Sequence, residues 1–303
     1  MQTSFASLPR PLLVAFAVLA IVAGCSGGGS PADVQATDGP ASDVPATDAA
    51  AEAELPDPRA IPADQAFLPT VADGRHWALD WREEFDGTAL DPAKWNVGNG
   101  PRRDGFWTPD AVSLDGQGHL VMDVYAAGGK RFDGEVDTQG KYDRAFGYFE
   151  ARMSLQRHEG HWPAFWLMPD SFGTVAGTGA DGAEIDVMEK PWAEGDKAGF
   201  VNHALHWDAY AAGAEASYMS QSDPSIQQGW HTYGLWWTES EYVFYIDGQE
   251  VWRTSAGGVC KVPLYLIFSD EIACGPWVLA DCLSDDELPD PWMVDYLRVF
   301  VAE

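Results

Sequence analysis

Residues 182–190 of the chain read GAEIDVMEK and place three carboxylates, Glu184, Asp186 and Glu189, among apolar residues typical of a buried strand. Desolvating an ionised carboxylate costs several kcal/mol, so unpaired acids are rare in such strands. Side chains of a strand alternate between its faces, so Glu184 and Asp186 share one face and Met188 would come next on it. One extra residue, a β-bulge, returns Glu189 to that face. The stretch therefore predicts a bulged strand that presents all three acids to one cleft.

Crowded carboxylates of this kind fit acid–base catalysis. Like charges at close range cannot all ionise easily, so at least one pKa should rise, and a general acid needs a proton held near neutral pH. A retaining glycosidase keeps its two carboxyl groups about 5–5.5 Å apart. Two long Glu side chains can lean toward each other over a short Asp186. The spacing alone is also compatible with a solvated acidic edge strand or a calcium site.

The chain from about residue 70 onward has an all-β texture. Short runs of β-branched and aromatic residues alternate with turn residues, which is typical of an all-β sandwich or barrel. The clearest runs cover residues 119–124, 148–153, 242–246 and 292–300, the third followed by Asp247-Gly248. No repeat of fixed period, phosphate-binding G-x-x-x-x-G-K-[ST] loop or H-E-x-x-H motif occurs, so P-loop and zincin chemistry have no support.

The composition and net charge of the chain limit the kinds of molecule that it can bind. The 303 residues carry a formal net charge of −29 and are 46% hydrophobic and 13% aromatic, enough for one sizeable core. Such an acidic chain should repel nucleic acid and sulfated or carboxylated polymers, so we expect no nucleic-acid partner and a neutral substrate. The many aromatic side chains can fill a core or line a groove that stacks on sugar rings.

The N-terminus is expected to be a targeting segment. Arg10 precedes the apolar run Leu12–Ala23, which is too short for a mature membrane span but suits a signal sequence. The run ends in Val22-Ala23-Gly24-Cys25, which resembles a bacterial lipoprotein signal and makes Cys25 the lipidated residue. A plain secretory cleavage nearby is the alternative.

Three segments follow from this interpretation: a signal peptide over 1–24, an acidic disordered linker over 25–65, and a folded domain over 66–303. Residues 26–65 hold eight acids against one Arg and show no apolar periodicity. The predicted location is the bacterial cell envelope, lipid-anchored and exported, or secreted. The lipid would be the only contact with a membrane.

Export permits disulfides. Apart from Cys25, the chain has Cys260, Cys274 and Cys282, an odd number that leaves one free thiol or an intermolecular pair. Cys274 and Cys282 flank a short loop-like segment and are the favoured pair.

Several motifs resemble one family. Glu184–Glu189 resembles the E-x-D-x-x-E signature of family-16 glycoside hydrolases, in the bulged form typical of laminarinase-like members, and Gly160–Pro169 resembles the G-x-W-P-A-F-W-x-x-P segment that precedes it. Further matches span roughly 77–301 in the family's order. They are Trp81–Gly87, Leu90–Trp95, Phe146–Arg152, His231–Trp237 and Val294–Val299.

The resemblance implies a β-jelly-roll sandwich of two curved antiparallel sheets, concanavalin-like, with a concave substrate cleft. It also implies a retaining O-glycosyl hydrolase in which Glu184 is the nucleophile and Glu189 the acid/base. Asp186 would lie between them and tune their protonation. His206 matches a histidine that faces the acid/base, against the alternative of a core or surface residue without a role.

Trp162 and Trp166 fit sugar platforms on one face, and core packing is the alternative for both. Adjacent Trp236 and Trp237 point to opposite sides, so at most one lines the cleft. The chemistry needs no cofactor.

The resemblance also implies a structural calcium far from the cleft, with Glu84, Gly116 and Asp295 as ligands. Oxygen ligands of this kind suit calcium. A monomer is expected.

The implied substrate is a neutral β-linked polysaccharide, foremost a β-1,3-glucan cleaved in endo fashion. The alternatives are a β-galactanase or agarase-type enzyme, a transglycosylating member of the family, and a non-catalytic carbohydrate-binding jelly roll. A structural surface lipoprotein would not require the acid spacing. Phe268–Cys274 and His203–Tyr210 depart from the family pattern, so the subgroup stays open.

Overall fold

The computed structural model describes residues 67–72, 74–193, 197–221, 229–275 and 281–303. The predicted signal peptide, the predicted linker and Cys25 lie outside the described residues. Within the described part, no helix is long and apolar enough to cross a membrane.

The first of two large sheets is antiparallel and has eight strands. Seven of them follow one another across the sheet, and the eighth, β1 (Trp77–Glu83), pairs with β20. The order of the seven is β18 (Gln249–Thr254), β17 (Tyr242–Ile246), β16 (His231–Trp237), β11 (Gly147–Ser154), β20 (Trp292–Ala302), β6 (Leu120–Met122) and β5 (Val112–Leu114).

The second sheet also has eight antiparallel strands, and it carries the three predicted acids on β13. The strand β10 (Asp143–Arg144) pairs with β19 beside the main path. The order along that path is β15 (Glu215–Gln221), β14 (Phe200–His206), β13 (Glu184–Glu189), β12 (Ala164–Met168), β19 (Leu264–Ser269), β9 (Glu135–Asp137) and β2 (Asn96–Val97).

Short elements complete the described part of the chain. Two hairpins pair β3 (Gly100–Arg102) with β4 (Gly105–Trp107), and β7 (Tyr125–Ala127) with β8 (Lys130–Phe132). The single-turn 3-10 helices are η1 (Pro109–Ala111), η3 (Asp208–Tyr210) and η5 (Asp285–Glu287).

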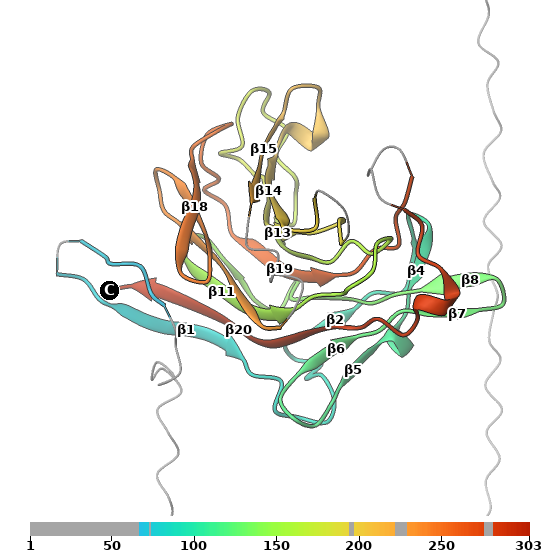
Figure 1. The fold of residues 1–303 in the computed structure, drawn as a ribbon. Coiled ribbons are helices and arrows are strands. Elements are labelled where there is room, and N and C mark those ends of the chain that lie inside the picture. Colours follow the sequence, from blue (N-terminus) through green and yellow to red (C-terminus); the bar gives the residue numbers. More distant parts are fainter. Residues whose placement is uncertain (1–66, 73, 194–196, 222–228, 276–280) are drawn as a thin grey trace, which may run out of the picture. The chain divides into compact units, whose positions relative to one another are not determined.

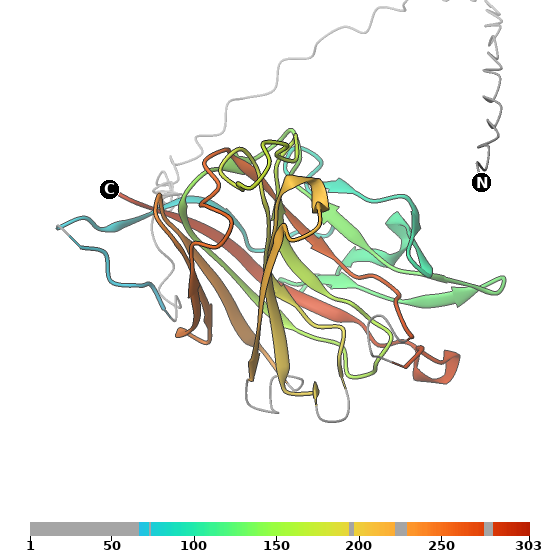
Figure 2. The same ribbon diagram turned by 90° about the horizontal axis from the view of Figure 1, so that it is seen from above.

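The two sheets are curved and stacked, as Figure 1 shows from the side and Figure 2 from above. Alternate side chains of each sheet point into the space between them, as expected for a sandwich. Phe149 of β11, Phe165 of β12, Phe244 of β17 and Trp237 of β16 are fully buried there. The predicted all-β architecture is confirmed, and the core lies between the sheets, which leaves the outer face of the second sheet free to form a site.

The predicted strands lie where the runs placed them. Residues 148–153, 242–246 and 292–300 fall within β11, β17 and β20, whereas residues 119–124 form only the short strand β6. Asp247 and Gly248 join β17 to β18 with φ values of 48° and 73°. Positive φ at both central residues is what a tight type I′ hairpin requires, so this Asp-Gly pair explains the sharp reversal.

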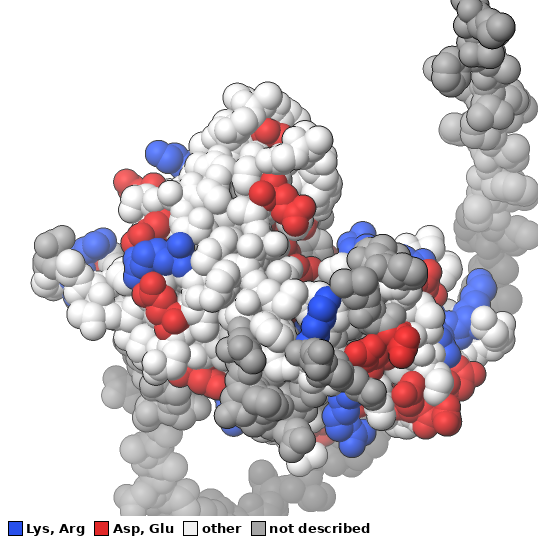
Figure 3. All heavy atoms as spheres, turned by 45° about the horizontal axis from the view of Figure 1, so that its top comes forward, with Lys and Arg blue, Asp and Glu red and all other residues white. Residues whose placement is uncertain are grey.

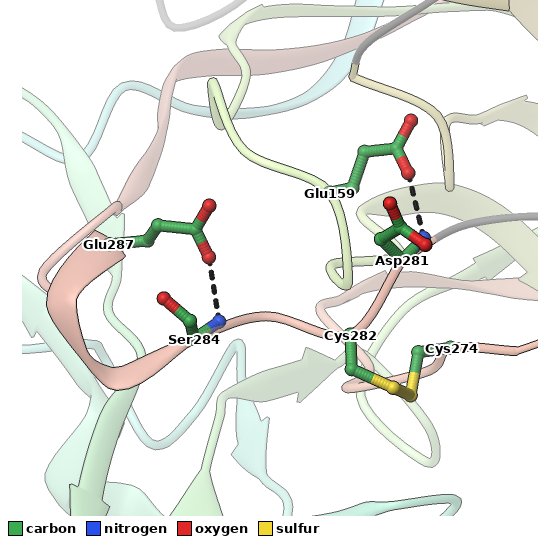
Figure 4. The surroundings of a disulfide bond; sticks show 6 residues. All are labelled: Glu159, Cys274, Asp281, Cys282, Ser284 and Glu287. Carbon is green, nitrogen blue, oxygen red and sulfur yellow. Dashed lines mark hydrogen bonds between the residues drawn. A yellow bond between two sulfur atoms is a disulfide. The ribbon is translucent and has the colours of Figure 1, made fainter.

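The predicted disulfide is confirmed. Cys274 and Cys282 are bonded, with their Cα atoms 4.7 Å apart, and Cys260 is a free, buried thiol. Figure 4 shows the bond and the side chains around it. Beside it, the Asp281 amide donates to Glu159 and the Ser284 amide to Glu287 (Figure 4). The disulfide therefore ties Cys282 to Cys274, which follows soon after the cleft residue Glu271 in the chain.

Candidate active site

A cleft of about 580 Å³ lies on the second sheet, across the strands β12 to β15. Its lining is rich in charged and aromatic side chains. The lining residues are Arg102, Arg103, Trp162, Ala164, Trp166, Glu184, Asp186, Glu189, Pro191, Trp192, Asn202, His206, Tyr210, Glu215, Ser217, Met219, Ser269 and Glu271.

The predicted bulge is confirmed in β13. Phe165 of β12 lies opposite Met188, but its neighbour Trp166 lies opposite Asp186, so Val187 is the extra residue. Met188 and Val187 both join Ile185 in the hydrophobic core. The acids Glu184, Asp186 and Glu189 all line the cleft. The bulge thus sorts six residues into three apolar ones on the inner face and three acids on the outer face.

Glu189 is held by two donors. The indole Nε1–H of Trp162 donates to Oε1 at 2.8 Å, and the Asn202 amide Nδ2 donates to Oε2 at 2.8 Å. Burial raises the pKa of Glu189, the two hydrogen bonds oppose that rise, and the charge of Glu184 adds to it. Both carboxylate oxygens therefore have fixed directions, and a proton is retained to higher pH than on a free Glu.

Glu184 has a different environment. The phenol of Tyr210 donates to Oε2 at 2.5 Å, and His206 Nε2 lies 3.9 Å from Oε1. Burial raises the pKa of Glu184, whereas the Tyr210 hydrogen bond and the positive charges of His206, Arg102 and Arg103 oppose the rise. Tyr210, His206 and the two arginines thus favour the ionised form against the effect of burial, which suits a nucleophile.

Asp186 lies between the two glutamates and is buried. Burial and the charges of Glu189, Glu184 and Glu215 raise its pKa well above the usual value. Its Oδ2 has no hydrogen-bond partner among the described residues. A buried carboxyl group beside like charges keeps its proton to higher pH than an ordinary Asp, and the short side chain of Asp186 separates the two glutamates.

The predicted orientation of His206 is wrong. It was expected to face Glu189, but its Nε2 lies 3.5 Å from Asp186 Oδ2 and 3.9 Å from Glu184 Oε1. The cause is the register of β14, which pairs Glu184 with His206 and Glu189 with Asn202. The residue that faces Glu189 from β14 is therefore Asn202, which the sequence analysis missed.

The two predicted tryptophans line the cleft. Trp166 donates its indole N–H to Ser269 Oγ at 3.1 Å. The guanidinium of Arg103 lies over the indole of Trp162, 4.5 Å from the ring centroid. Trp162 therefore orients Glu189 and carries a stacked cation, while Trp166 is the better placed of the two to meet a sugar. Neither Trp236 nor Trp237 lines this cleft.

Residues distant in the chain support this arrangement. Arg102 Nε donates to Glu271 Oε1 at 2.5 Å, and Arg103 donates to the other oxygen of Glu271. Next to Glu271, the buried Asp270 accepts the backbone N–H of Trp162 at 3.1 Å. The segment Phe268–Cys274, which departs from the family pattern, thus sets the position of the rim arginines and of Trp162.

The predicted calcium ligands do not fit a cation as they are placed. Both oxygens of Glu84 accept from the guanidinium of Arg298, at 2.9 and 2.8 Å. Asp295 accepts from Arg152 at 2.5 Å. Calcium would have to displace both arginines from these two side chains. Among the residues that the structure describes, three ligating side chains meet only at Glu184, Asp186 and His206.

A two-sheet β-sandwich with paired glutamates in an open cleft defines a jelly-roll glycoside hydrolase. The chain belongs to the glycosyl hydrolases family 16, whose model matches residues 100–269. The predicted family, jelly-roll fold and enzyme class are thereby confirmed.

Relatives agree with this assignment. The chain is 26% identical over 261 residues to glucan endo-1,3-beta-glucosidase A1 of Niallia circulans, covering 73% of this chain but 37% of that protein. It is 26% identical over 249 residues to a beta-glucanase of Rhodothermus marinus, covering 74% and 85%. The solved laminarinase of Flavobacterium sp. UMI-01 superposes with a TM-score of 0.64 at 26% identity, covering 74% of this chain and all of that one (100%).

Proposed function

We propose that the protein is a retaining endo-hydrolase of a neutral β-1,3-linked glucan. The observation that carries this proposal is the placement of Glu184, Asp186 and Glu189 on one face of β13 in an open cleft. An open cleft accepts the middle of a long chain, which suits endo cleavage. The glucanase and laminarinase relatives support the substrate class.

In the proposed reaction, a carboxylate oxygen of Glu184 forms a bond with the anomeric carbon while the glycosidic bond breaks. Glu189 gives its proton to the departing oxygen. Glu189 then takes a proton from water, the water oxygen bonds to the anomeric carbon, and the bond to Glu184 breaks. Both glutamates return to their starting states, and two inversions give net retention.

A neutral ligand suits the charges of the cleft. The carboxyl groups of Glu184, Asp186, Glu189, Glu215 and Glu271 outnumber the two arginines that line it. On the face drawn in Figure 3, acidic and basic side chains form small separate groups with wide uncharged areas between them. We propose that the protein acts as a monomer.

A β-linked galactan is the second candidate substrate, because the chain is also 27% identical over 248 residues to a keratan-sulfate endo-1,4-beta-galactosidase of Sphingobacterium multivorum. Transglycosylation would use the same glycosyl-enzyme with a sugar hydroxyl in place of water. No step of either reaction is routed through calcium, since Glu84 and Asp295 are held by arginines.

The test is product release by the full chain from laminarin, mixed-linkage glucan, xyloglucan, agarose and carrageenan, with the anomer of the first product read by NMR. Glu184→Gln should lose activity, whereas Glu250→Gln, which changes an exposed glutamate paired with Arg253, should keep it. Activity on agarose alone would overturn the glucan assignment and keep the mechanism. Binding without turnover in every case would favour a carbohydrate-binding module.

We also propose that Cys25 carries a lipid and anchors the enzyme to the cell envelope after export. The support is the order of Arg10, the apolar run Leu12–Ala23 and Cys25. Stable anchoring requires more than one acyl chain. Cys25→Ser should move the protein from the membrane fraction to the soluble one, while Cys260→Ser should not. A Cys25→Ser protein that stays in the membrane fraction would refute the anchor.

A further inference from the structure

Tyr210 is an exposed side chain with an unusual partner. Tyr210 is 58% exposed, yet its hydroxyl donates a hydrogen bond to Oε2 of Glu184 at 2.5 Å. An exposed phenol gains little from such a bond in water, because water can replace either partner. For this hydrogen bond to position Glu184, the surrounding chain must therefore hold Tyr210 in place.

The backbone at Tyr210 is held in a conformation that ordinary residues avoid. Asp208, Ala209 and Tyr210 have φ values of 51°, 50° and 62°, and none of them is glycine. Left-handed backbone is uncommon at any single residue of this kind, and such outliers gather at functional sites. Three in succession form η3, which turns the chain back toward the cleft.

Contacts from a second loop hold this turn. The Gly177 amide donates to Asp208 Oδ2 at 2.6 Å, and the Ala211 amide donates to Asp208 O at 3.1 Å. The ring of Phe172 meets the ring of Tyr210 edge-on, with centroids 4.7 Å apart. The segment with Phe172 and Gly177 thus contacts both the ring and the turn, and the ring of His206 on β14 meets Tyr210 with centroids 5.7 Å apart, so the hydroxyl is held beside Glu184.

We propose that Tyr210 is a positioning residue of the nucleophile: its hydroxyl holds Oε2 of Glu184 and leaves Oε1 to attack the anomeric carbon. This inference rests on the proposed function, in which Glu184 is the nucleophile. His206 Nε2 lies 3.9 Å from Oε1, too far for a hydrogen bond. The two oxygens of one carboxylate therefore have different tasks.

The hydroxyl serves both chemical steps. During attack it fixes the plane of the carboxylate, so that the lone pair on Oε1 meets the anomeric carbon in line. In the glycosyl-enzyme, Oε2 becomes the ester carbonyl oxygen. When that ester breaks, the electron pair returns to Glu184, and the phenol stabilises the charge that develops on Oε2. Partial burial and the charge of Glu184 raise the pKa of Tyr210, so the phenol keeps its proton at neutral pH.

Removing the hydroxyl should change the titration of Glu184 in one direction. A donor to an ionised carboxylate lowers its pKa, so the loss of that donor raises it. The other titratable or charged groups around Glu184 stay in place. They are Arg102, Arg103, Asp186, Glu189, His206 and Tyr265. Glu215 lies one strand further out, 4.0 Å from His206 Nδ1.

The experiment is the pH dependence of kcat/KM for Tyr210→Phe on the polysaccharide that the wild type hydrolyses. The phenylalanine ring keeps the contact with Phe172. We expect kcat/KM to fall roughly 10- to 100-fold, the factor expected for one hydrogen bond to a charged group, mainly through kcat. The acidic limb of the profile should move to higher pH. Tyr218→Phe is the matched control, because Tyr218 is 43% exposed, stacks on Trp252 and does not line the cleft.

A second variant separates positioning from general damage. Asp208→Ala releases the turn without touching Glu184, so it should lower kcat/KM less than Tyr210→Phe and add nothing in the Tyr210→Phe background. Full activity of Tyr210→Phe, an unmoved acidic limb, or additive losses in the double variant would each overturn the inference. An inactive wild type would instead overturn the proposed function, so the two failures are distinguishable.

Discussion

The two glutamates of the cleft lie on the same strand, yet the chain holds them in different ways. Glu189 is bound by Trp162, which lies just before β12, and by Asn202 within β14, so the sheet and the segment that enters it fix this carboxylate. Glu184 is bound by Tyr210, which extends from a left-handed turn on the rim. The proposed acid/base is therefore positioned mainly by the sheet, and the proposed nucleophile by a loop.

This difference indicates which part of the site tolerates a change of sequence without loss of the fold. A change in the sheet around Glu189 would disturb strand pairing and the core beneath it. A change in the turn at Tyr210 would alter the nucleophile while leaving both sheets intact. The predictions below test this contrast, from the largest expected effect to the smallest.

Glu184→Gln should abolish turnover, because neither covalent step can proceed without the nucleophile. We expect a loss on the order of 10⁴- to 10⁶-fold in kcat, comparable to the removal of a covalent nucleophile elsewhere. The melting temperature should be unchanged or higher, because one of three crowded carboxyl groups becomes neutral. Steady-state kinetics and a thermal melt check both statements. A variant that melts much earlier would make its inactivity uninformative.

Glu189→Gln should be less severe and should depend on the leaving group. Loss of a general acid–base catalyst costs about 10²- to 10⁴-fold. An aryl glycoside whose leaving group needs no proton should form the glycosyl-enzyme at nearly the normal rate, and then release sugar slowly. A burst of aryl product followed by slow turnover is the expected trace. Equal loss on activated and natural substrates would contradict the assignment of Glu189 as acid.

Asn202→Ala should move the alkaline limb of the pH profile, whereas Tyr210→Phe should move the acidic limb. Asn202 donates to Glu189 and so lowers its pKa, and the loss of that donor raises it. Since Glu189 must be protonated at the start of the reaction, the alkaline limb of kcat/KM should move to higher pH, with a roughly 10-fold drop in rate. The two limbs report macroscopic pKa values that belong to the coupled acids together. Movement of the acidic limb alone would break the contrast between the two glutamates.

Trp162→Phe should give the smallest effect. It removes the second donor to Glu189 but keeps an aromatic ring beneath Arg103 and leaves Asn202 in place. We expect a few-fold loss of kcat/KM and a smaller upward movement of the alkaline limb than in Asn202→Ala. The same pH series measures it. A loss larger than that of Asn202→Ala would show that the indole itself contacts sugar.

The alternation of apolar and polar residues was sufficient to predict an all-β sandwich or barrel, one bulge before Glu189 and the common face of the three acids, whereas the position of the bulge at Val187 comes from the structure. These features depend on local periodicity, which the order of residues contains directly. The disulfide followed from the short spacing of Cys274 and Cys282. The orientation of His206 did not follow, because it depends on the register between β13 and β14, and one strand alone does not contain that register.

The missed residues of the site reach it through the tertiary structure. Arg102 and Glu271 are 169 positions apart and meet only after β3 and the end of β19 come together. Asp208 is of a type that visits left-handed backbone as a single residue, but Ala209 and Tyr210 are not, so three such residues in succession were not predictable from residue preferences. The only available signal was the departure of His203–Tyr210 from the family pattern.

The bulge at Val187 also bears on how chain length can vary in this strand. Deleting Val187 would leave the order Glu, Ile, Asp, Met, Glu, in which plain alternation again places all three acids on one side. A single-residue gap here would thus shorten the span between the glutamates and remove one core side chain without reversing any polarity. At most positions of a strand a one-residue deletion exchanges inside for outside. Two sequences that differ by such a gap can therefore be aligned across it with every acid still matched to an acid.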